Sequence, residues 1–164
     1  MKQNSPDIWS DKLPSLKHGG HKYDRGHALI YGAPEFTGAT RLAAGACARI
    51  GAGLVTVLGG QKGDVYRASL PAHIMVRDNL VWFDEKVSAA LYGSGGLPTE
   101  INFNRDIPTI LDADALKNLP ERLSPNFILT PHEGEFAKAF PEIDGSKAEK
   151  AQKAAKSINA IIVL

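Results

Sequence analysis

Acidic and imidazole side chains of this sequence lie where buried strands are expected to end. Asp112 and Asp114 come directly after an apolar run that ends at Leu111, and His132 and Glu135 follow the next apolar run along the chain. In open parallel α/β sheets, ligands bind at the carboxyl ends of the strands. Carboxylates and an imidazole at this place are suited to ligand contact and to proton exchange. The sequence therefore predicts a ligand-binding cleft bordered by these side chains.

The same residues also have a purely structural interpretation. Asp114 would be the N-cap of a helix that runs to Leu119. Glu133 and Glu135 would fall in the first turn of a later helix, where carboxylates are favoured by the helix dipole. One aspartate can cap a helix while the other faces a cleft, so both interpretations stay open at this point.

Two glycine-containing turns indicate a second kind of contact. The segment 32–38 mixes Gly, Pro and Thr, and Thr37 is predicted to be the N-cap of the helix that follows. A ligand would lie where this loop meets the helix N-terminus. Gly93 and Gly95 form the second turn, and glycines let a backbone approach a phosphate or an adenine closely. Glycines are also common in ordinary turns, so this second turn alone is weak support.

A strand, a helix and a second strand are predicted to position the first of these turns. The segments 28–31 and 54–58 are short apolar runs typical of strands buried on both faces. The helix between them is predicted to bury an apolar stripe formed by Leu42, Ala43, Ala46, Cys47 and Ile50. Gly51 marks the end of this helix. Such a crossover between parallel strands is almost always right-handed.

The rest of the chain continues the alternation of strands and helices. We expect strands at 73–76, 80–83, 107–111, 127–129 and 160–164, and helices at 65–70, 85–91 and 146–159. The last strand, Ala160–Leu164, has the composition of a strand buried on both faces. This pattern predicts a three-layer α/β domain with a mostly parallel sheet.

Composition and charge exclude several classes of protein. The 164 residues are 43% hydrophobic and 23% charged, and their formal net charge is +1, so nothing favours nucleic acid or an anionic membrane as a partner. The amino-terminal residues lack the apolar core of a secretory signal, and a cytoplasmic protein is expected. The single cysteine, Cys47, excludes an internal disulfide and is expected to be a small buried hydrophobe.

Three motifs, taken in order, resemble one known family. They are H-K-Y-D-R-G-H-A-L-I-Y-G-A-P-E-F-T-G-A-T-R-L-A-A-G-A-C-A-R-I-G-A-G-L-V-T-V-L from His21, P-T-I-L-D-A-D-A-L from Pro108, and I-L-T-P-H-E-G-E-F from Ile128. Together they look like the ADP-dependent NAD(P)H-hydrate dehydratase family, the carboxyl-terminal domain of bifunctional NAD(P)H-hydrate repair enzymes. The resemblance extends from about His21 to Leu164 and implies a ribokinase-like fold.

The resemblance also implies a reaction and its site residues. The family removes the water wrongly added across the nicotinamide ring of NADH or NADPH, with consumption of ADP (ATP in some members) and with Mg²⁺. Phosphorylation of the ring hydroxyl would create a good leaving group, and elimination would then restore the ring. The residues carried over by motif are Gly38 and Ala39 in the hydrate pocket, His132 at the hydrated dinucleotide, Glu135 on the metal and phosphate side, Asp112 and Asp114 at the border of the cleft, and Gly93 and Gly95 in the family's glycine loop.

This sequence departs from the family pattern at two places. The glycine loop usually reads G-P-G-L-G, but here it is G-S-G-G-L at 93–97. The family also continues after I-I-V-L with a K-G segment and a G-S-G-D or G-T-G-D motif that supplies an anion hole and the catalytic aspartate, and neither is in these 164 residues. We therefore expect a leader at 1–20 and a partial ribokinase-like domain at 21–164, without a catalytic aspartate.

Three functional hypotheses follow from these observations. The first is ADP-dependent dehydration of NAD(P)H-hydrate, with little turnover by this chain alone. The second is a non-catalytic truncated product or one subunit of a split enzyme, which would act as a homo-oligomer or with a partner chain that supplies the remaining part. The third is a ribokinase-like kinase for a small alcohol, against which the segment L-T-P-H-E-G-E-F argues. The ligands are nucleotides in the first case.

Overall fold

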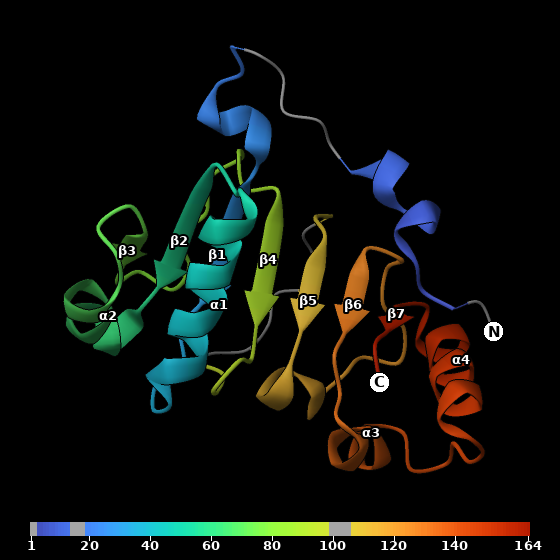
Figure 1. The fold of residues 1–164 in the computed structure, drawn as a ribbon. Coiled ribbons are helices and arrows are strands. Elements are labelled where there is room, and N and C mark those ends of the chain that lie inside the picture. The colour runs from blue at the N-terminus through green and yellow to red at the C-terminus, as the bar shows by residue number, and fades with distance from the viewer. Residues whose placement is uncertain (1–2, 14–18, 99–105) are drawn as a thin grey trace.

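The computed structural model describes residues 3–13, 19–98 and 106–164, and a seven-stranded sheet of order β3-β2-β1-β4-β5-β6-β7 forms its centre (Figure 1). All the neighbouring strands pair in parallel. The strands are β1 (His27–Tyr31), β2 (Leu54–Leu58), β3 (Met75–Arg77), β4 (Ala89–Tyr92), β5 (Thr109–Leu111), β6 (Phe127–Leu129) and β7 (Ile161–Ile162). The predicted α/β class with a mostly parallel sheet is confirmed.

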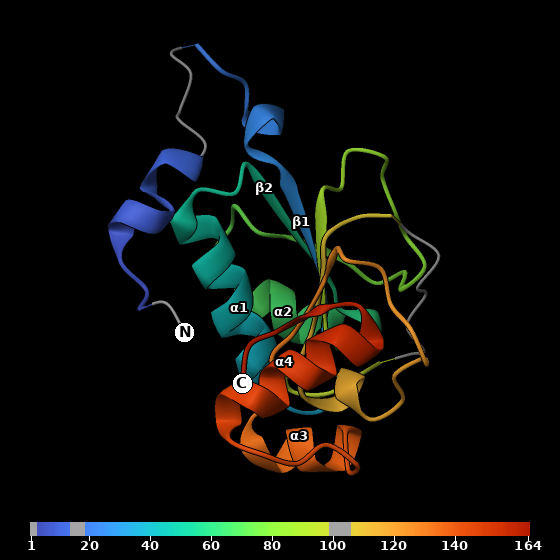
Figure 2. The ribbon, with the colours of Figure 1, turned by 90° about the vertical axis from the view of Figure 1, so that its right-hand side faces the viewer.

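Helices connect the strands and cover the sheet. The α-helices are α1 (Thr37–Ile50), α2 (Gly63–Ser69), α3 (Glu133–Ala139) and α4 (Lys147–Ile158). Short 3₁₀ turns are η1 (Pro6–Ile8), η2 (Ser10–Lys12), η3 (Lys22–Arg25), η4 (Gly60–Lys62) and η5 (Ala113–Leu116). Figure 2 brings α3 and α4 to the front, with α1 to one side. No helix in the described ranges combines the length and apolarity needed to cross a membrane. The expected leader at 1–20 lies partly outside the described residues.

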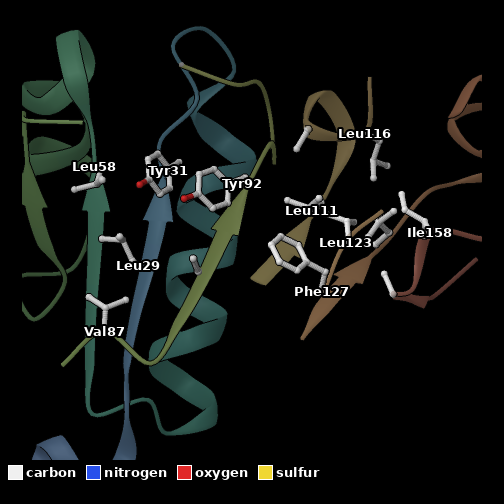
Figure 3. Close-up of a cluster of buried hydrophobic side chains, with 14 residues drawn as sticks. Leu29, Tyr31, Leu58, Val87, Tyr92, Leu111, Leu116, Leu123, Phe127 and Ile158 are labelled. Atoms are coloured by element: carbon white, nitrogen blue, oxygen red, sulfur yellow. The ribbon is translucent and has the colours of Figure 1, made fainter. Parts of the chain in front are cut away.

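The two faces of the sheet carry separate hydrophobic cores, because successive side chains of a strand point to opposite faces. On the α1 face, Ile30 and Val57 pack with Ala44 of α1 and Tyr66 of α2. The opposite face, here called the α4 face, carries the larger cluster, to which α4 contributes Ile158 (Figure 3). The stacked rings of Tyr31 and Tyr92, with centroids 4.0 Å apart, belong to that cluster and fix the carboxyl ends of β1 and β4 side by side.

The region between β3 and β5 differs from the prediction. The segment 85–91 was expected to be a short helix, but it consists of a turn followed by β4, the strand between β1 and β5. The run Leu80–Phe83 was expected to be a strand and is irregular. Ala89 and Ala90 have good intrinsic helix propensity, but pairing with β1 on one side and β5 on the other overrides it.

Helix α1 differs from the prediction at its start and along its apolar stripe. Thr37 is the first helical residue, Phe36 occupies the N-cap position, and no side chain caps the helix, so the predicted cap is wrong. Leu42 and Ile50 are 78% and 90% exposed, whereas Thr40 and Ala44 are fully buried. Cys47 is half-buried against the α1-face core, and burial raises the pKa of its thiol.

The α1 face is only partly covered. Leu91, Ile110, Ile128 and Ile161 are register partners on neighbouring strands and so form one row on this face, here called the apolar strip. Ile161 is 52% exposed and the nearby Val163 is 57% exposed. The expectation that Ala160–Leu164 is buried on both faces is therefore wrong for the side of the strand that carries Ile161.

Candidate functional site

The predicted site residues lie along one edge of the sheet. The parallel strands β1, β4, β5 and β6 end at this edge, and the segments that follow them contain Gly38 (the second residue of α1), Gly93, Asp112 and His132 respectively (Figure 1). Three strand spacings separate β1 from β6. At about 4.8 Å each, these spacings correspond to roughly 14 Å. The row of loops is therefore long enough to contact several parts of a ligand of nucleotide size.

The glycine loop at 93–96 packs closely between the turn before α1 and the turn after β5. Gly93 has φ +97°, and a Cβ added there would lie 1.9 Å from the carbonyl oxygen of Asp112. Gly95 has φ +83°, and its Cβ would lie 2.3 Å from the carbonyl oxygen of Phe36. Only glycine fits both positions without displacing a neighbouring backbone. The loop thus sets the spacing between the turn before α1 and the turn after β5.

The carboxylate of Asp112 connects two of these loops. Its Oδ2 accepts a hydrogen bond from Ser94 Oγ at 2.6 Å, and its Oδ1 accepts one from Thr130 Oγ1 at 3.1 Å. Asp114 lies elsewhere, because its carboxylate pairs with Lys117 Nζ at 2.6 Å. Asp112, not Asp114, occupies the N-cap position of η5, and it makes no side-chain cap bond. The interpretation of Asp114 as an N-cap is therefore wrong.

His132 and Glu135 form a capping box at the start of α3. Nδ1 of His132 accepts hydrogen bonds from Gly134 N at 3.0 Å and Glu135 N at 3.4 Å, and Glu135 Oε2 accepts one from His132 N at 3.0 Å. An acceptor role for Nδ1 places the proton of the neutral ring on Nε2. The His132 side chain is 72% exposed. Its exposed Nε2–H, which lies 3.5 Å from Glu135 Oε1, can therefore donate to a ligand, while the backbone fixes the ring.

The first turn of α1 leaves its backbone accessible at Gly38. A Cβ added to Gly38 would meet nothing within 4 Å, whereas Ala39 Cβ lies 3.2 Å from the Cβ position of Gly95. Behind this turn, Thr40 Oγ1 accepts from Ala33 N at 3.0 Å and donates to Ser94 O at 3.2 Å. The structure thus brings the turn before α1 against the glycine loop.

Sequence reasoning did not identify the hydroxyl side chains that join these loops. Thr40, Ser94 and Thr130 each contribute a side-chain hydrogen bond between segments far apart in sequence. The one available signal was Thr40, a polar residue in the first turns of a helix rich in small apolar residues. Nothing in the sequence around Ser94 or Thr130 predicts Asp112 as a common partner.

Comparison with known proteins identifies the family. The family model described as NAD(P)H-hydrate dehydratase matches residues 27–164. The chain belongs to the NAD(P)H-hydrate dehydratase family. It is 34% identical to a bifunctional NAD(P)H-hydrate repair enzyme of Coxiella burnetii over 152 residues, covering 77% of this chain and 29% of that protein. A protein of the same description from Methanopyrus kandleri is 33% identical over 156 residues, covering 85% of this chain and 31% of the relative.

Solved structures of this family and fold superpose on the chain. The ADP/ATP-dependent NAD(P)H-hydrate dehydratase of Bacillus subtilis, co-crystallised with ATP/Mg²⁺, has a TM-score of 0.76 and 30% identity, over 93% of this chain and 62% of that one. A ribokinase-like protein of Enterococcus faecalis has a TM-score of 0.77 at 21% identity, over 98% of this chain and 64% of that one, and shows the fold alone. The chain thus spans about a third of its curated relatives and under two thirds of the Bacillus structure.

The carboxylates at the carboxyl edge of the sheet suit Mg²⁺ only when a phosphate supplies further ligands. Among residues 3–13, 19–98 and 106–164, no group of three or more His, Cys, Asp or Glu side chains could hold a metal ion. Mg²⁺ in nucleotide sites is commonly held by one or two carboxylates, with phosphate oxygens and water completing its octahedron. Glu135 fits this role, because Oε2 accepts the His132 N–H and Oε1 makes no comparably short contact, its neighbour being His132 Nε2 at 3.5 Å.

A hollow lies between α3 and α4. It has a volume of about 600 Å³, and its lining includes Phe136, Phe140, Lys147, Lys150 and Leu164. Of the predicted site residues, none lines it, although the adjacent Glu133 does. The predicted dehydratase residues therefore border the loops at the sheet edge and not this hollow.

Proposed function

We propose that the loops at the carboxyl edge bind hydrated NADH or NADPH and that this chain takes part in its ADP-dependent dehydration. The observation that supports the proposal most strongly is the contact between the turn before α1, the glycine loop and Asp112, with His132 at the end of the same row. Membership in the dehydratase family over residues 27–164 supports the choice of substrate.

Each group in the row has a proposed role that follows from its chemistry. The open backbone at Gly38 and Ala39 would let the hydrated ring approach closely, and Gly95 would do the same from the adjacent loop. His132 would donate its Nε2–H to the hydrated dinucleotide. Glu135 would hold Mg²⁺ together with the phosphates of ADP or ATP. Asp112 and Gly93 would border the cleft without touching the ring, and Asp114 would lie at its margin.

The reaction would require a change in the leaving group of the hydrate. A hydroxyl on the reduced ring leaves poorly, and transfer of a phosphoryl group to its oxygen would convert it into a good leaving group. Elimination of inorganic phosphate, with loss of a proton from the neighbouring ring carbon, would then restore the conjugated ring of NAD(P)H. Mg²⁺ and the nucleotide would supply charge neutralisation and the phosphoryl group when bound. The residues of this chain would position the ring and exclude water from it.

We further propose that turnover needs groups from a part of the dehydratase domain that these 164 residues do not contain. The chain spans 62% of the Bacillus dehydratase, and Asp112 is already engaged by two hydroxyls. A partner chain, or a second copy of this chain, would then cover the apolar strip on the α1 face. Such a partner explains why apolar residues of strands β5 and β7 are exposed.

The proposal is tested by measuring binding and turnover separately. Equilibrium dialysis of the 164-residue protein against NADPH-hydrate should show saturable binding that His132→Ala weakens about tenfold, the expected effect of losing a hydrogen bond to a charged or buried group. Recovery of NADPH absorbance with ADP and Mg²⁺ should stay below about 1 per second, the low end of enzymatic rates. Absence of saturable binding would contradict the substrate assignment, and faster turnover would contradict the need for a partner.

A further inference from the structure

Both carboxylate oxygens of Asp112 accept hydrogen bonds within the protein. Its two oxygens accept from Ser94 at 2.6 Å and from Thr130 at 3.1 Å, and these residues belong to the loops after β4 and after β6. Both loops carry proposed binding residues, Gly95 in one and His132 in the other. Asp112 lies on the loop after β5, between them. Its side chain therefore spans the separation between two binding loops.

The connection extends further, to the turn before α1. Thr40 Oγ1 accepts from Ala33 N and donates to the carbonyl oxygen of Ser94, while the hydroxyl of Ser94 donates to Asp112. Ala33, Thr40, Ser94, Asp112 and Thr130 thus form a continuous series of hydrogen bonds across four loops, here called the relay. It runs behind the row of proposed binding residues.

Two features of the relay depend on residue type. An ionised carboxylate accepts at both oxygens, whereas an asparagine in the same place can accept at only one atom. A hydrogen bond from a hydroxyl to a carboxylate is shorter and stronger than one between neutral groups. The link between Ser94 and Asp112 therefore needs both the hydroxyl and the carboxylate.

The backbone around Asp112 is constrained as well. Asp112 N donates to Tyr92 O at 3.0 Å, and Ala115 N donates to Asp112 O at 3.0 Å. Ala113, between them, has φ +45°, a left-handed conformation that alanine rarely adopts. The turn keeps this conformation because its neighbours hold it on both sides. The carboxylate thus projects from a fixed backbone and cannot easily follow a shift of either loop.

We propose that Asp112 is a positioning residue that holds the glycine loop and the segment 130–135 at a fixed separation, and that Ser94 transmits this constraint to the turn before α1. Where these loops bind the hydrated nicotinamide, a role that rests on the proposed function, the relay sets the width of the opening between Gly95 and His132. Loss of one hydroxyl then loosens a loop that the altered residue does not touch.

Hydrogen exchange of backbone amides tests the relay without any ligand. Ser94→Ala should raise the exchange rates of the Gly134 and Glu135 amides about tenfold, the effect expected from losing one hydrogen bond to a charged group. Ser94→Thr, which keeps a hydroxyl, should restore them. The matched control is Asp114→Asn, because Asp114 pairs with Lys117 and lies outside the relay. Increased exchange confined to residues 93–96 in Ser94→Ala would overturn the proposal.

Binding of NADPH-hydrate provides the second readout. Ser94→Ala and Asp112→Asn should each weaken binding about tenfold, and the double variant should weaken it no further than the stronger single one, because both remove the same link. Additive losses would overturn the relay. Ser94→Ala leaves the Asp112–Thr130 bond in place and so tests the relay even if Asp112→Asn unfolds. Failure of the unaltered protein to bind would refute the proposed function, while the exchange result would still decide on the relay.

Discussion

Gly95 lies where the glycine loop meets the turn before α1, and the site should tolerate little change there. Its positive φ disfavours any other residue, and an added Cβ would lie 2.3 Å from the Phe36 carbonyl oxygen. We predict that Gly95→Ala lowers the free energy of unfolding by more than about 2 kcal/mol, from backbone strain and from displacement of the turn. Urea unfolding of the variant and of the unaltered protein measures this difference.

The matched control for that variant is Gly45→Ala, in the middle of α1. Gly45 is helical, and a Cβ there would meet nothing within 4 Å. This change should raise the free energy of unfolding by about 0.5–1 kcal/mol, because alanine is the better helix former. If the two variants changed the free energy of unfolding equally, Gly95 would not lie as close to the Phe36 carbonyl as the structure shows.

His27 is a buried histidine that should make stability depend on pH. Its Nε2 lies 2.8 Å from Thr56 Oγ1. Burial lowers its pKa, the charge of Arg77 adds to this, and Asp84 opposes it. A lowered pKa means that the folded protein binds fewer protons than the unfolded chain, so stability falls as pH drops through about 6.5 towards the folded pKa.

The prediction is that His27→Gln removes part of this acid sensitivity. The free energy of unfolding of the unaltered protein should fall between pH 7.5 and 5.5 more than that of the variant does. The excess is at most about 1.4 kcal/mol per pH unit, the limit for one proton. Urea melts of both proteins at the two pH values give the difference. A steeper loss of stability on acidification in the variant than in the unaltered protein would contradict the predicted direction of the effect.

At the residue scale, the sequence predicts the charged groups of the site better than the neutral ones. Asp112 and His132 follow apolar runs, and that pattern alone places them at the carboxyl edge of the sheet. The sequence did not predict the roles of Ser94, Thr40 and Thr130. Tertiary packing determines which group a hydroxyl bonds to, and neither periodicity nor composition reveals that packing. For the same reason the sequence could not determine that Asp114 pairs with Lys117.

Helices α1 and α4 begin in different ways, and the difference can be measured. Ser146 caps α4, since its Oγ accepts from Glu149 N at 3.4 Å and Glu149 Oε2 accepts from Ser146 N at 2.8 Å. Thr37 makes no cap bond in α1. Ser146→Ala should therefore lower the free energy of unfolding by about 1 kcal/mol, and Thr37→Ala by a few tenths at most. A larger effect at Thr37 would favour the cap predicted from sequence.

At the element scale, prediction succeeds where local pattern and tertiary context agree. Strands β2 and β6 and helix α4 lie where periodicity and flanking glycine, serine or asparagine place them. The segment 85–91 was predicted as a short helix, and within it Ala89–Leu91, now part of β4, has no β-branched residue. Its position between two established strands supplies the pairing that decides its conformation, and this information is non-local.

At the scale of the whole molecule, helices cover one half of the α1 face and leave the other half partly exposed. Helices α1 and α2 pack on β1 to β3, whereas Ile110 and Ile161 of the apolar strip remain exposed. Ile50, the last residue of α1, is exposed as well.

This arrangement predicts a chain that associates through the strip. Each fully buried Ile or Leu contributes roughly 1.5–3 kcal/mol to the free energy of unfolding. Leaving the side chains of the strip uncovered therefore gives up an amount that is large beside a typical net stability of about 5–15 kcal/mol. A dye specific for exposed apolar surface should bind the purified protein, and Ile110→Thr with Ile161→Thr should reduce that binding. Val81→Thr, an exposed residue outside the strip, is the control. Absence of dye binding, with a monodisperse monomer in size-exclusion, would contradict the prediction.

The central claim is that the carboxyl-edge loops bind hydrated NAD(P)H, and a titration of the isotopically labelled protein with NADPH-hydrate, followed by backbone amide NMR, tests it most directly. We expect saturable shifts of the amides of Gly38, Ala39, Gly95 and Glu135. Amides at the opposite edge, such as that of Gly53, should not move. Shifts confined to the hollow between α3 and α4, for example at Ala137 and Gly145, or no shifts at millimolar ligand, would contradict it.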